Sequence, residues 1–174
     1  DDAAAIKALL DEARADSPAG TRVACIVTTH SHWDHVRAPK DLADYTGART
    51  AAGTQDAADI EVPTDLLLEQ GGLKEADGIG LEVIKLRGHT PGSVALLYRD
   101  PAGPAHLFTG DSLFPGGVGN TGKDPARFQQ LFHDVVERIF DSLPDDTIVH
   151  PGHGKGTTLG AERPHLDEWK ARGW

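Results

Sequence analysis

The chain has 174 residues, of which 39% are hydrophobic and 25% are charged, and its formal net charge is −10. These values are typical of a globular domain with a buried core, and no apolar run approaches the roughly 20 residues that span a bilayer. An acidic balance disfavours nucleic acid as the main partner, because phosphate binding needs a basic face. It therefore disfavours a nuclease as well.

The predicted elements mix helices and strands along the chain. Residues 2–14 form an amphipathic helix with Ile6, Leu9 and Leu10 on one face, and residues 22–28 form a buried strand. Later expected elements are a short helix at 41–45 ended by Gly47, strands at 81–86, 93–98, 106–109 and 147–149, a helix from 124 to 143 and a final helix at 164–172. Turns are predicted at 17–20, Gly71-Gly72, Asp77-Gly78 and 101–104.

Two of these helices carry clear sequence signals. Asp124 is a helix cap followed by Pro125 at the first helical position. Apolar residues then recur down one face as far as Leu143, which indicates packing against the core. In the final helix Trp169 is expected to face inward. The chain is thus of α/β type, with its functional loops at the strand ends.

The single cysteine, Cys25, cannot form an internal disulfide. It lies in the apolar run before the first His motif, so we expect a buried, reduced thiol. A chain without disulfides is typical of a reducing compartment, and no targeting segment is visible. We therefore predict a cytoplasmic protein without a membrane partner. The oligomeric state cannot be derived from the sequence.

Most of the nine histidines and two of the aspartates gather where predicted strands run into loops. They are His30, His32, Asp34 and His35 at the first junction, His89 at the second, Asp111 at the third, and His150 and His153 at the fourth. The other three histidines, His106, His133 and His165, are interpreted as ordinary surface or packed residues.

The spacing within the first junction indicates a metal site. His30 and His32 are two residues apart, so an extended backbone projects both rings from one face and they can hold one cation. Asp34 and His35 follow as the chain turns and can hold a second, and a carboxylate such as Asp111 can bridge two ions. Imidazole with carboxylate suits zinc, and also iron or manganese. A structural site is usually closed by four ligands, whereas seven candidate ligands imply two ions with open coordination positions. Open positions indicate catalysis.

The motifs that contain these residues resemble those of a known family. His30-Ser31-His32-Trp33-Asp34-His35, Gly88-His89-Thr90-Pro91-Gly92-Ser93, Gly110-Asp111-Ser112-Leu113-Phe114 and Pro151-Gly152-His153-Gly154 are similar to the ordered motifs of the metallo-β-lactamase-fold hydrolases, in particular the glyoxalase II-like branch. The resemblance covers about residues 23–154 and implies an αββα sandwich. It also implies two ligand groups, His30, His32 and His89 for one metal, and Asp34, His35 and His153 for the other, with Asp111 bridging. His150 matches no ligand position.

Two departures from the family pattern affect the predictions. Only 29 residues precede His30, so we expect residues 1–174 to form a single domain whose N-terminal strands precede residue 1. Ser93 and the Gly119-Asn120-Thr121 loop stand where glyoxalase II-like members often carry a second His and an Arg. These two differences count against a glutathione thioester as the substrate.

The predicted function is a dinuclear metal-dependent hydrolase in which a metal-bridging hydroxide cleaves a small ester, thioester or lactone. Asp34 is the candidate catalytic residue, because it can orient the nucleophile or take up its proton. The alternatives are a mononuclear iron persulfide dioxygenase-like enzyme, a β-lactamase and a non-catalytic metal-binding domain. A cytoplasmic location counts against the β-lactamase, and a full ligand set counts against the non-catalytic domain.

Overall fold

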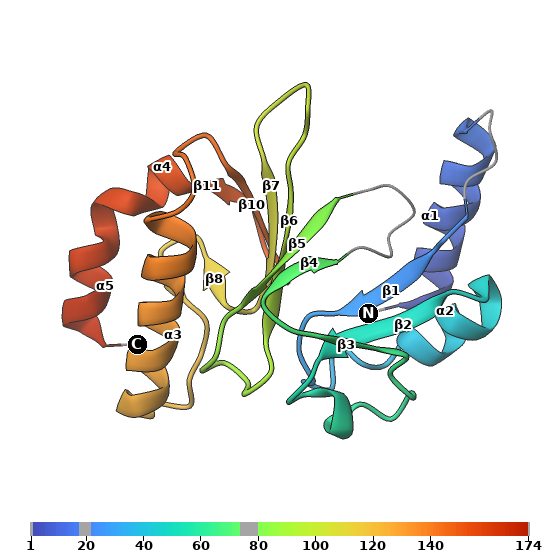
Figure 1. The fold of residues 1–174 in the computed structure, drawn as a ribbon, viewed down its shortest axis with the longest axis horizontal. Coiled ribbons are helices and arrows are strands. Elements are labelled where there is room, and N and C mark those ends of the chain that lie inside the picture. Colours follow the sequence, from blue (N-terminus) through green and yellow to red (C-terminus); the bar gives the residue numbers. More distant parts are fainter. Residues whose placement is uncertain (1, 18–21, 74–79, 174) are drawn as a thin grey trace.

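The computed structural model describes residues 2–17, 22–73 and 80–173, and its elements form four layers (Figure 1). Helices α1 (Ala3–Asp16) and α2 (Pro39–Thr46) lie on one outer side, next to a three-stranded sheet. A six-stranded sheet follows, and three more helices cover its far side. This arrangement is the predicted αββα sandwich. Residues 18–20 of the turn predicted at 17–20, and the predicted turn at Asp77-Gly78, fall outside the described residues. The turn predicted at Gly71-Gly72 was wrong, because both glycines lie in a strand at Gly71–Leu73.

The smaller sheet consists of β1 (Cys25–Thr28), β2 (Arg49–Gly53) and β3 (Leu66–Leu68), all parallel, in that order. Parallel neighbours need a crossover connection, and α2 supplies it between β1 and β2. Gly47 ends α2 in the left-handed conformation, with φ of 67°, as the sequence predicted. A short 3-10 turn, η1 (Ala57–Asp59), precedes β3.

The larger sheet has the strand order β11-β10-β7-β6-β5-β4. Its strands are β4 (Gly71–Leu73), β5 (Leu81–Lys85), β6 (Val94–Tyr98), β7 (His106–Gly110), β10 (Ile148–Pro151) and β11 (Thr157–Thr158). All neighbours are antiparallel except β7 and β10, which are parallel. The carboxyl ends of β7 and β10 therefore lie at the same edge. A small hairpin of β8 (Leu113–Phe114) and β9 (Gly117–Val118) follows β7.

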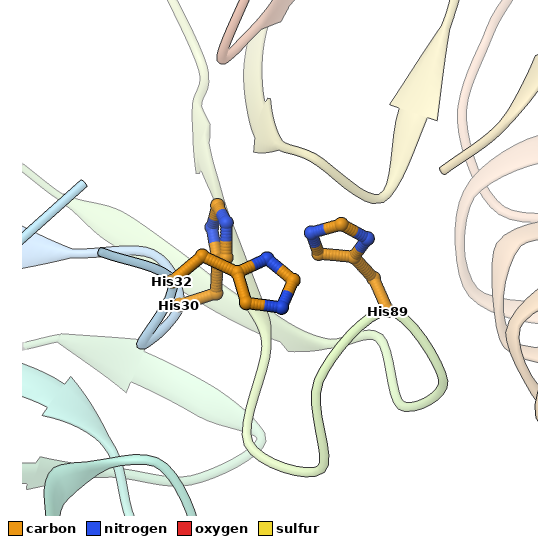
Figure 2. A group of neighbouring side chains, drawn as sticks. All are labelled: His30, His32 and His89. Atoms are coloured by element: carbon orange, nitrogen blue, oxygen red, sulfur yellow. The ribbon is translucent and has the colours of Figure 1, made fainter. Parts of the chain in front are cut away.

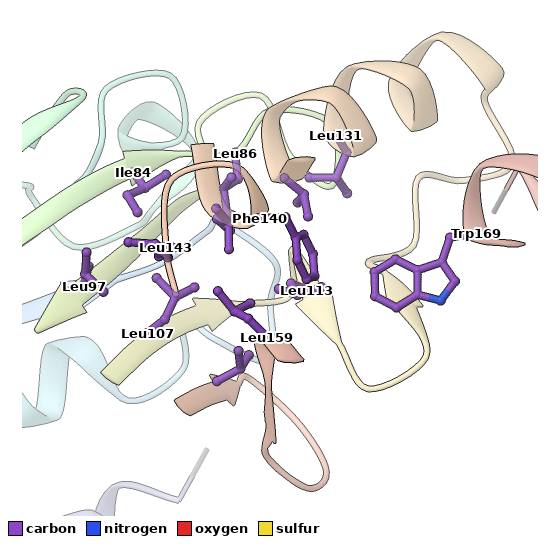
Figure 3. Close-up of a cluster of buried hydrophobic side chains, with 14 residues drawn as sticks. Ile84, Leu86, Leu97, Leu107, Leu113, Leu131, Phe140, Leu143, Leu159 and Trp169 are labelled. Atoms are coloured by element: carbon purple, nitrogen blue, oxygen red, sulfur yellow. The ribbon is translucent and has the colours of Figure 1, made fainter. Parts of the chain in front are cut away.

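The main core lies between the larger sheet and the C-terminal helices (Figure 3). These are α3 (Pro125–Val135), α4 (Leu159–Glu162) and α5 (Leu166–Arg172), with the 3-10 turn η3 (Arg163–His165) before α5. Asp124 caps α3 and Trp169 is 1% exposed, both as predicted. The predicted single helix instead continues from α3 as a π-helical turn, η2 (Val136–Phe140), and its apolar stripe still reaches the core.

A second apolar cluster joins the two sheets. Ala51 and Leu68 from the smaller sheet pack against Val83, Val94 and Leu96 from the larger one. This cluster fixes the smaller sheet against the larger one, and so sets the distance between the loops that leave their strand ends.

The N-terminal elements are less buried than predicted. The helix α1 contains no buried residue, and Leu9 is 64% exposed. Its main contacts are with α2, and α1 lies at the outer side of the smaller sheet (Figure 1). The strand β1 is half-buried because it lies at one edge of the smaller sheet, so Cys25 is only partly buried and the prediction of a buried thiol was wrong. Within the described residues, no helix is both long and apolar enough to cross a bilayer.

Candidate metal centre

All seven predicted ligands come from loops that follow strands, and they lie at one edge of the two sheets. The segment after β1 carries His30, His32, Asp34 and His35, and the β5–β6 connection carries His89. Asp111 follows β7 and His153 follows β10. Because β7 and β10 are parallel neighbours, their last residues are brought together by the sheet itself.

The first group of side chains consists of three imidazoles, those of His30, His32 and His89 (Figure 2). One ring nitrogen of each lies within 4.8 Å of the others. The ring centroids are 5.0 Å apart for His30 and His32, 4.8 Å for His30 and His89, and 4.5 Å for His32 and His89. His30 and His89 are 1% and 5% exposed, whereas His32 is exposed. The group thus has a closed inner wall and an open outer side.

The second group consists of Asp34, His35 and His153. The Nε2 atom of His153 lies 2.9 Å from Nε2 of His35 and 3.1 Å from Oδ2 of Asp34. Asp111 stands between the two groups. Its Oδ1 is 3.5 Å from Nε2 of His35, and its Oδ2 is 3.8 Å from Nε2 of His89 and 3.6 Å from Nε2 of His153.

Three buried polar atoms at this place have no hydrogen-bond partner among the described residues. They are Nε2 of His30, Nε2 of His89 and Oδ1 of Asp111. An unpaired buried polar atom costs about 1–3 kcal/mol, so such atoms need an explanation. His89 donates from Nδ1 to the carbonyl of Asn120 at 2.8 Å, which leaves Nε2 as a bare acceptor facing the site. That arrangement is typical of a metal-binding histidine, so the residues fit divalent ions.

The electrostatics keep the inner imidazoles neutral. Burial, together with the nearby His35, His89 and His32, lowers the pKa of His30 to about 3. Burial also lowers the pKa of His89 and that of His35 from their ordinary values. Neutral imidazole is the form that binds metal, so the fold holds these side chains ready for a cation at neutral pH.

Glycines allow the loops to approach one another. A Cβ atom on Gly152 would lie 2.3 Å from Oδ1 of Asp111 and 2.8 Å from Cε1 of His35. A Cβ atom on Gly110, whose φ is 49°, would lie 2.5 Å from Oγ1 of Thr29. Any larger residue at either position would therefore push the ligand loops apart.

The other histidines lie outside both groups. Nδ1 of His106 is 3.0 Å from Nε2 of His150, and the His150 ring stacks on Phe108. His133 and His165 are exposed and lie next to glutamates. The sequence reasoning missed Asp56, whose carboxylate contacts the ligand loops, and the Asn120 carbonyl. Neither belongs to a recognisable spacing pattern.

Comparison with known proteins agrees with this geometry. The profile of the Metallo-beta-lactamase superfamily matches residues 2–153. Hydroxyacylglutathione hydrolase GloC of Haemophilus influenzae is 28% identical over 156 residues, which cover 79% of this chain and 72% of GloC. Against other curated relatives, the chain spans as little as 49% of their length.

Solved structures show the same fold. The BLEG-1 B3 metallo-beta-lactamase is 28% identical, with a TM-score of 0.78 over 97% of this chain and 84% of that one. The structure of TTHA1623 in a di-iron-bound form is 33% identical, with a TM-score of 0.70 over 94% of this chain and 83% of that one. With hydroxyacylglutathione hydrolases among its relatives at 28–37% identity, this chain belongs to the Metallo-beta-lactamase superfamily.

Proposed function

We propose that the chain is a dinuclear metal-dependent hydrolase that cleaves a small ester, thioester or lactone. The observation that carries the proposal is the position of Asp111, within 3.8 Å of His35, His89 and His153 and between two groups of three ligands. A single carboxylate in this position can serve both groups at once.

The proposed ligand assignment follows the two groups. His30, His32 and His89 would hold one ion, Asp34, His35 and His153 the other, and Asp111 would bridge them. A divalent ion held by these residues would lower the pKa of a coordinated water to near 7 and would polarise a carbonyl oxygen. Imidazole and carboxylate ligands make zinc the first choice, with iron or manganese as alternatives. The di-iron form of TTHA1623 supports two ions.

Asp34 is the residue that we propose handles the proton. Burial acts to raise the pKa of Asp34, but a backbone hydrogen bond and the neighbouring imidazoles of His35 and His153 outweigh it and hold the pKa below its ordinary value. The carboxylate is therefore ionised at neutral pH, and about a third of its surface is exposed. It can orient an attacking water or accept its proton.

A neighbouring cavity supports a small-molecule substrate. Its volume is about 720 Å³, which is within the usual range for small ligands. It is lined by Val118, Gly119, Asn120, Thr121, Lys123 and Gly173. One of the lining residues is Asn120, whose backbone carbonyl accepts a hydrogen bond from Nδ1 of His89, so the cavity lies beside the first group. The net charge of −10 also favours a small molecule over nucleic acid.

A second candidate function is β-lactam hydrolysis, which the similarity to the BLEG-1 B3 metallo-beta-lactamase supports. Both candidates use a metal centre to open an acyl bond, so the ligand residues do not separate them. The two functions differ in the residues that contact the substrate, so the turnover of test substrates has to distinguish them.

One experiment tests the proposal and its rival together. The purified chain is analysed for metal content and then assayed on a panel that holds acyl esters, a hydroxyacylglutathione thioester, lactones and a chromogenic β-lactam. The expected result is about two metal ions per chain and turnover of an ester, thioester or lactone. Turnover of the β-lactam alone would favour the rival. One iron per chain with oxygen consumption, or metal binding without any turnover, would contradict the proposal.

A further inference from the structure

Asp56 is a buried carboxylate that the proposed reaction does not use. It lies between β2 and η1 and is 0% exposed. Its Oδ2 accepts hydrogen bonds from the backbone N–H of Ser31 at 3.0 Å and from the hydroxyl of Thr90 at 2.5 Å. Its Oδ1 accepts from the backbone N–H of Gly92 at 2.6 Å. Three donors thus converge on one side chain.

These donors belong to the two loops that carry the first group of histidines. Ser31 stands between His30 and His32, whereas Thr90 and Gly92 follow His89 within three residues. The Asp56 carboxylate therefore ties together two loops that lie 25 residues before it and 34 to 36 residues after it in the chain. In this way the Asp56 carboxylate fixes the distance between the first two histidines and His89, although its own hydrogen bonds go to other residues of these loops.

The packing around Asp56 leaves little room for adjustment. A Cβ atom on Gly92 would lie 2.7 Å from Oδ1 of Asp56 and 2.4 Å from its backbone nitrogen. A Cβ atom on Gly53 would lie 1.9 Å from the carbonyl oxygen of Gly92. Both glycines allow the β2 end and the His89 loop to meet closely, and this close approach brings the carboxylate within reach of its donors.

The chemistry of this junction needs an acceptor-only group. Ionised Asp offers two oxygens and no donor, which matches two N–H groups and a hydroxyl. An amide of the same size would turn its NH₂ group toward at least one of those donors. Hydrogen bonds to a charged acceptor are also about twice as strong as neutral ones, so they offset the cost of burying the carboxylate.

We propose that Asp56 is a positioning residue that sets the spacing of His30, His32 and His89 for metal binding. The inference rests on the proposed metal centre, but not on any particular substrate. The His89 loop also has support on another side, because Arg127 donates from Nε to the carbonyl of Gly88 at 2.8 Å. Loss of Asp56 is therefore expected to let the two loops shift relative to each other rather than to unfold either one.

The test compares Asp56→Asn with Asp65→Asn. Asp65 is the control because its carboxylate also accepts a hydrogen bond from a backbone N–H, that of Thr50 in the smaller sheet, at 2.8 Å. It belongs to neither ligand group. Zinc affinity is measured on the metal-free wild type and both variants by competition with a chromophoric chelator. The visible absorption of the cobalt-loaded proteins reports the coordination geometry, and urea unfolding of the metal-free proteins reports stability.

The expected result is that Asp56→Asn binds zinc about 10–100-fold more weakly than the wild type and changes the cobalt spectrum. Asp65→Asn is expected to lose stability without either change. If Asp56→Asn does not fold, Thr90→Val, which removes only one donor, is expected to weaken zinc binding several-fold. The test variant is Asp56→Asn, or Thr90→Val if Asp56→Asn does not fold. If its zinc affinity and cobalt spectrum equal those of Asp65→Asn, the positioning role of Asp56 is overturned.

The outcomes separate this inference from the proposed function. If the wild type binds zinc but hydrolyses nothing, the proposed hydrolase is wrong, while the comparison of Asp56→Asn with Asp65→Asn still decides the positioning role. If the wild type hydrolyses a substrate and Asp56→Asn binds zinc normally, only the positioning role is wrong. If the wild type binds no metal, both fail.

Discussion

Nε2 of His35 lies 2.9 Å from Nε2 of His153, although 118 residues separate them along the chain. Two imidazole nitrogens at this distance must share either a proton or a cation, because two lone pairs repel each other. With Asp34 3.1 Å from His153, the same place also offers a carboxylate oxygen. The tertiary structure therefore assembles a second ligand group beside the three-histidine group, and this pairing is what favours two ions over one.

Replacing His153 tests that second group by itself. The side chain is 54% exposed, so His153→Ala is expected to fold with nearly unchanged stability. The bound metal should fall from about two ions to about one per chain, and hydrolysis should fall about 100-fold or more. The measurements are elemental analysis, urea unfolding and an assay on the best substrate. His165→Ala, which removes another exposed histidine that belongs to neither ligand group, is the control and should change none of these values. Two tightly bound ions in His153→Ala would contradict the assignment.

Gly152 offers a steric test of the Asp111 position. In Gly152→Ala the new methyl group would lie 2.3 Å from Oδ1 of Asp111, so the carboxylate or the loop must move. We expect metal affinity to fall by about tenfold or more while the fold is kept, at a cost of about 1–3 kcal/mol for overpacking. Chelator competition measures the affinity. Gly80→Ala, whose Cβ meets no atom of the described residues within 4 Å, is the matched control. Equal affinities in the two variants would argue against a role for Asp111 in metal binding.

The Arg87–Asp134 pair provides a prediction about stability and pH. Asp134 is fully buried and accepts from Nε of Arg87 at 2.9 Å and from its NH2 group at 2.8 Å. Burial acts to raise the pKa of Asp134, but the hydrogen bonds from Arg87 and the charge of Arg138 outweigh it and hold the pKa below its ordinary value. Because the folded-state pKa is depressed, this stabilisation is present above about pH 4 and is lost as the pH falls further.

Asp134→Asn is therefore expected to lower the free energy of unfolding by about 2 kcal/mol at pH 7. The difference from the wild type should shrink as the pH falls below about 4, because the unfolded wild-type chain then takes up a proton at Asp134 that the folded protein resists. Urea unfolding of the metal-free proteins at pH 7 and near pH 3 measures both differences. A difference of the same size at both values would mean that the charge of Asp134 does not carry the effect.

The candidate site could be predicted from the sequence because its chemistry is concentrated in short motifs. Two histidines in His30-Ser31-His32 must project together from an extended segment, and glycines beside Asp111 and His153 mark the turns at strand ends. The caps of α2 and α3 were equally local, with Gly47 and Asp124 in their predicted roles. Features of this kind depend on a few neighbouring residues, which a sequence displays directly.

The features that the sequence did not reveal depend on tertiary contacts. Nothing near Asp56 in the chain indicates that its partners lie 25 to 36 residues away in two other loops. The helical spacing of the apolar residues in α1 predicted that Leu9 is buried. Leu9 is exposed because α1 lies beside α2 at the outer side of the smaller sheet. The π-helical turn at Val136–Phe140 keeps the same apolar stripe, so a pattern of apolar residues does not distinguish it from an α-helix.

Anomalous diffraction from crystals of the zinc-loaded chain, with data collected at the zinc absorption edge, tests the dinuclear centre by locating each ion. Two peaks are expected. One lies about 2.0–2.1 Å from nitrogens of His30, His32 and His89, the other lies next to Asp34, His35 and His153, and an oxygen of Asp111 reaches each. A single peak, or zinc bound away from Asp111, would contradict the dinuclear centre and the hydrolytic function proposed from it.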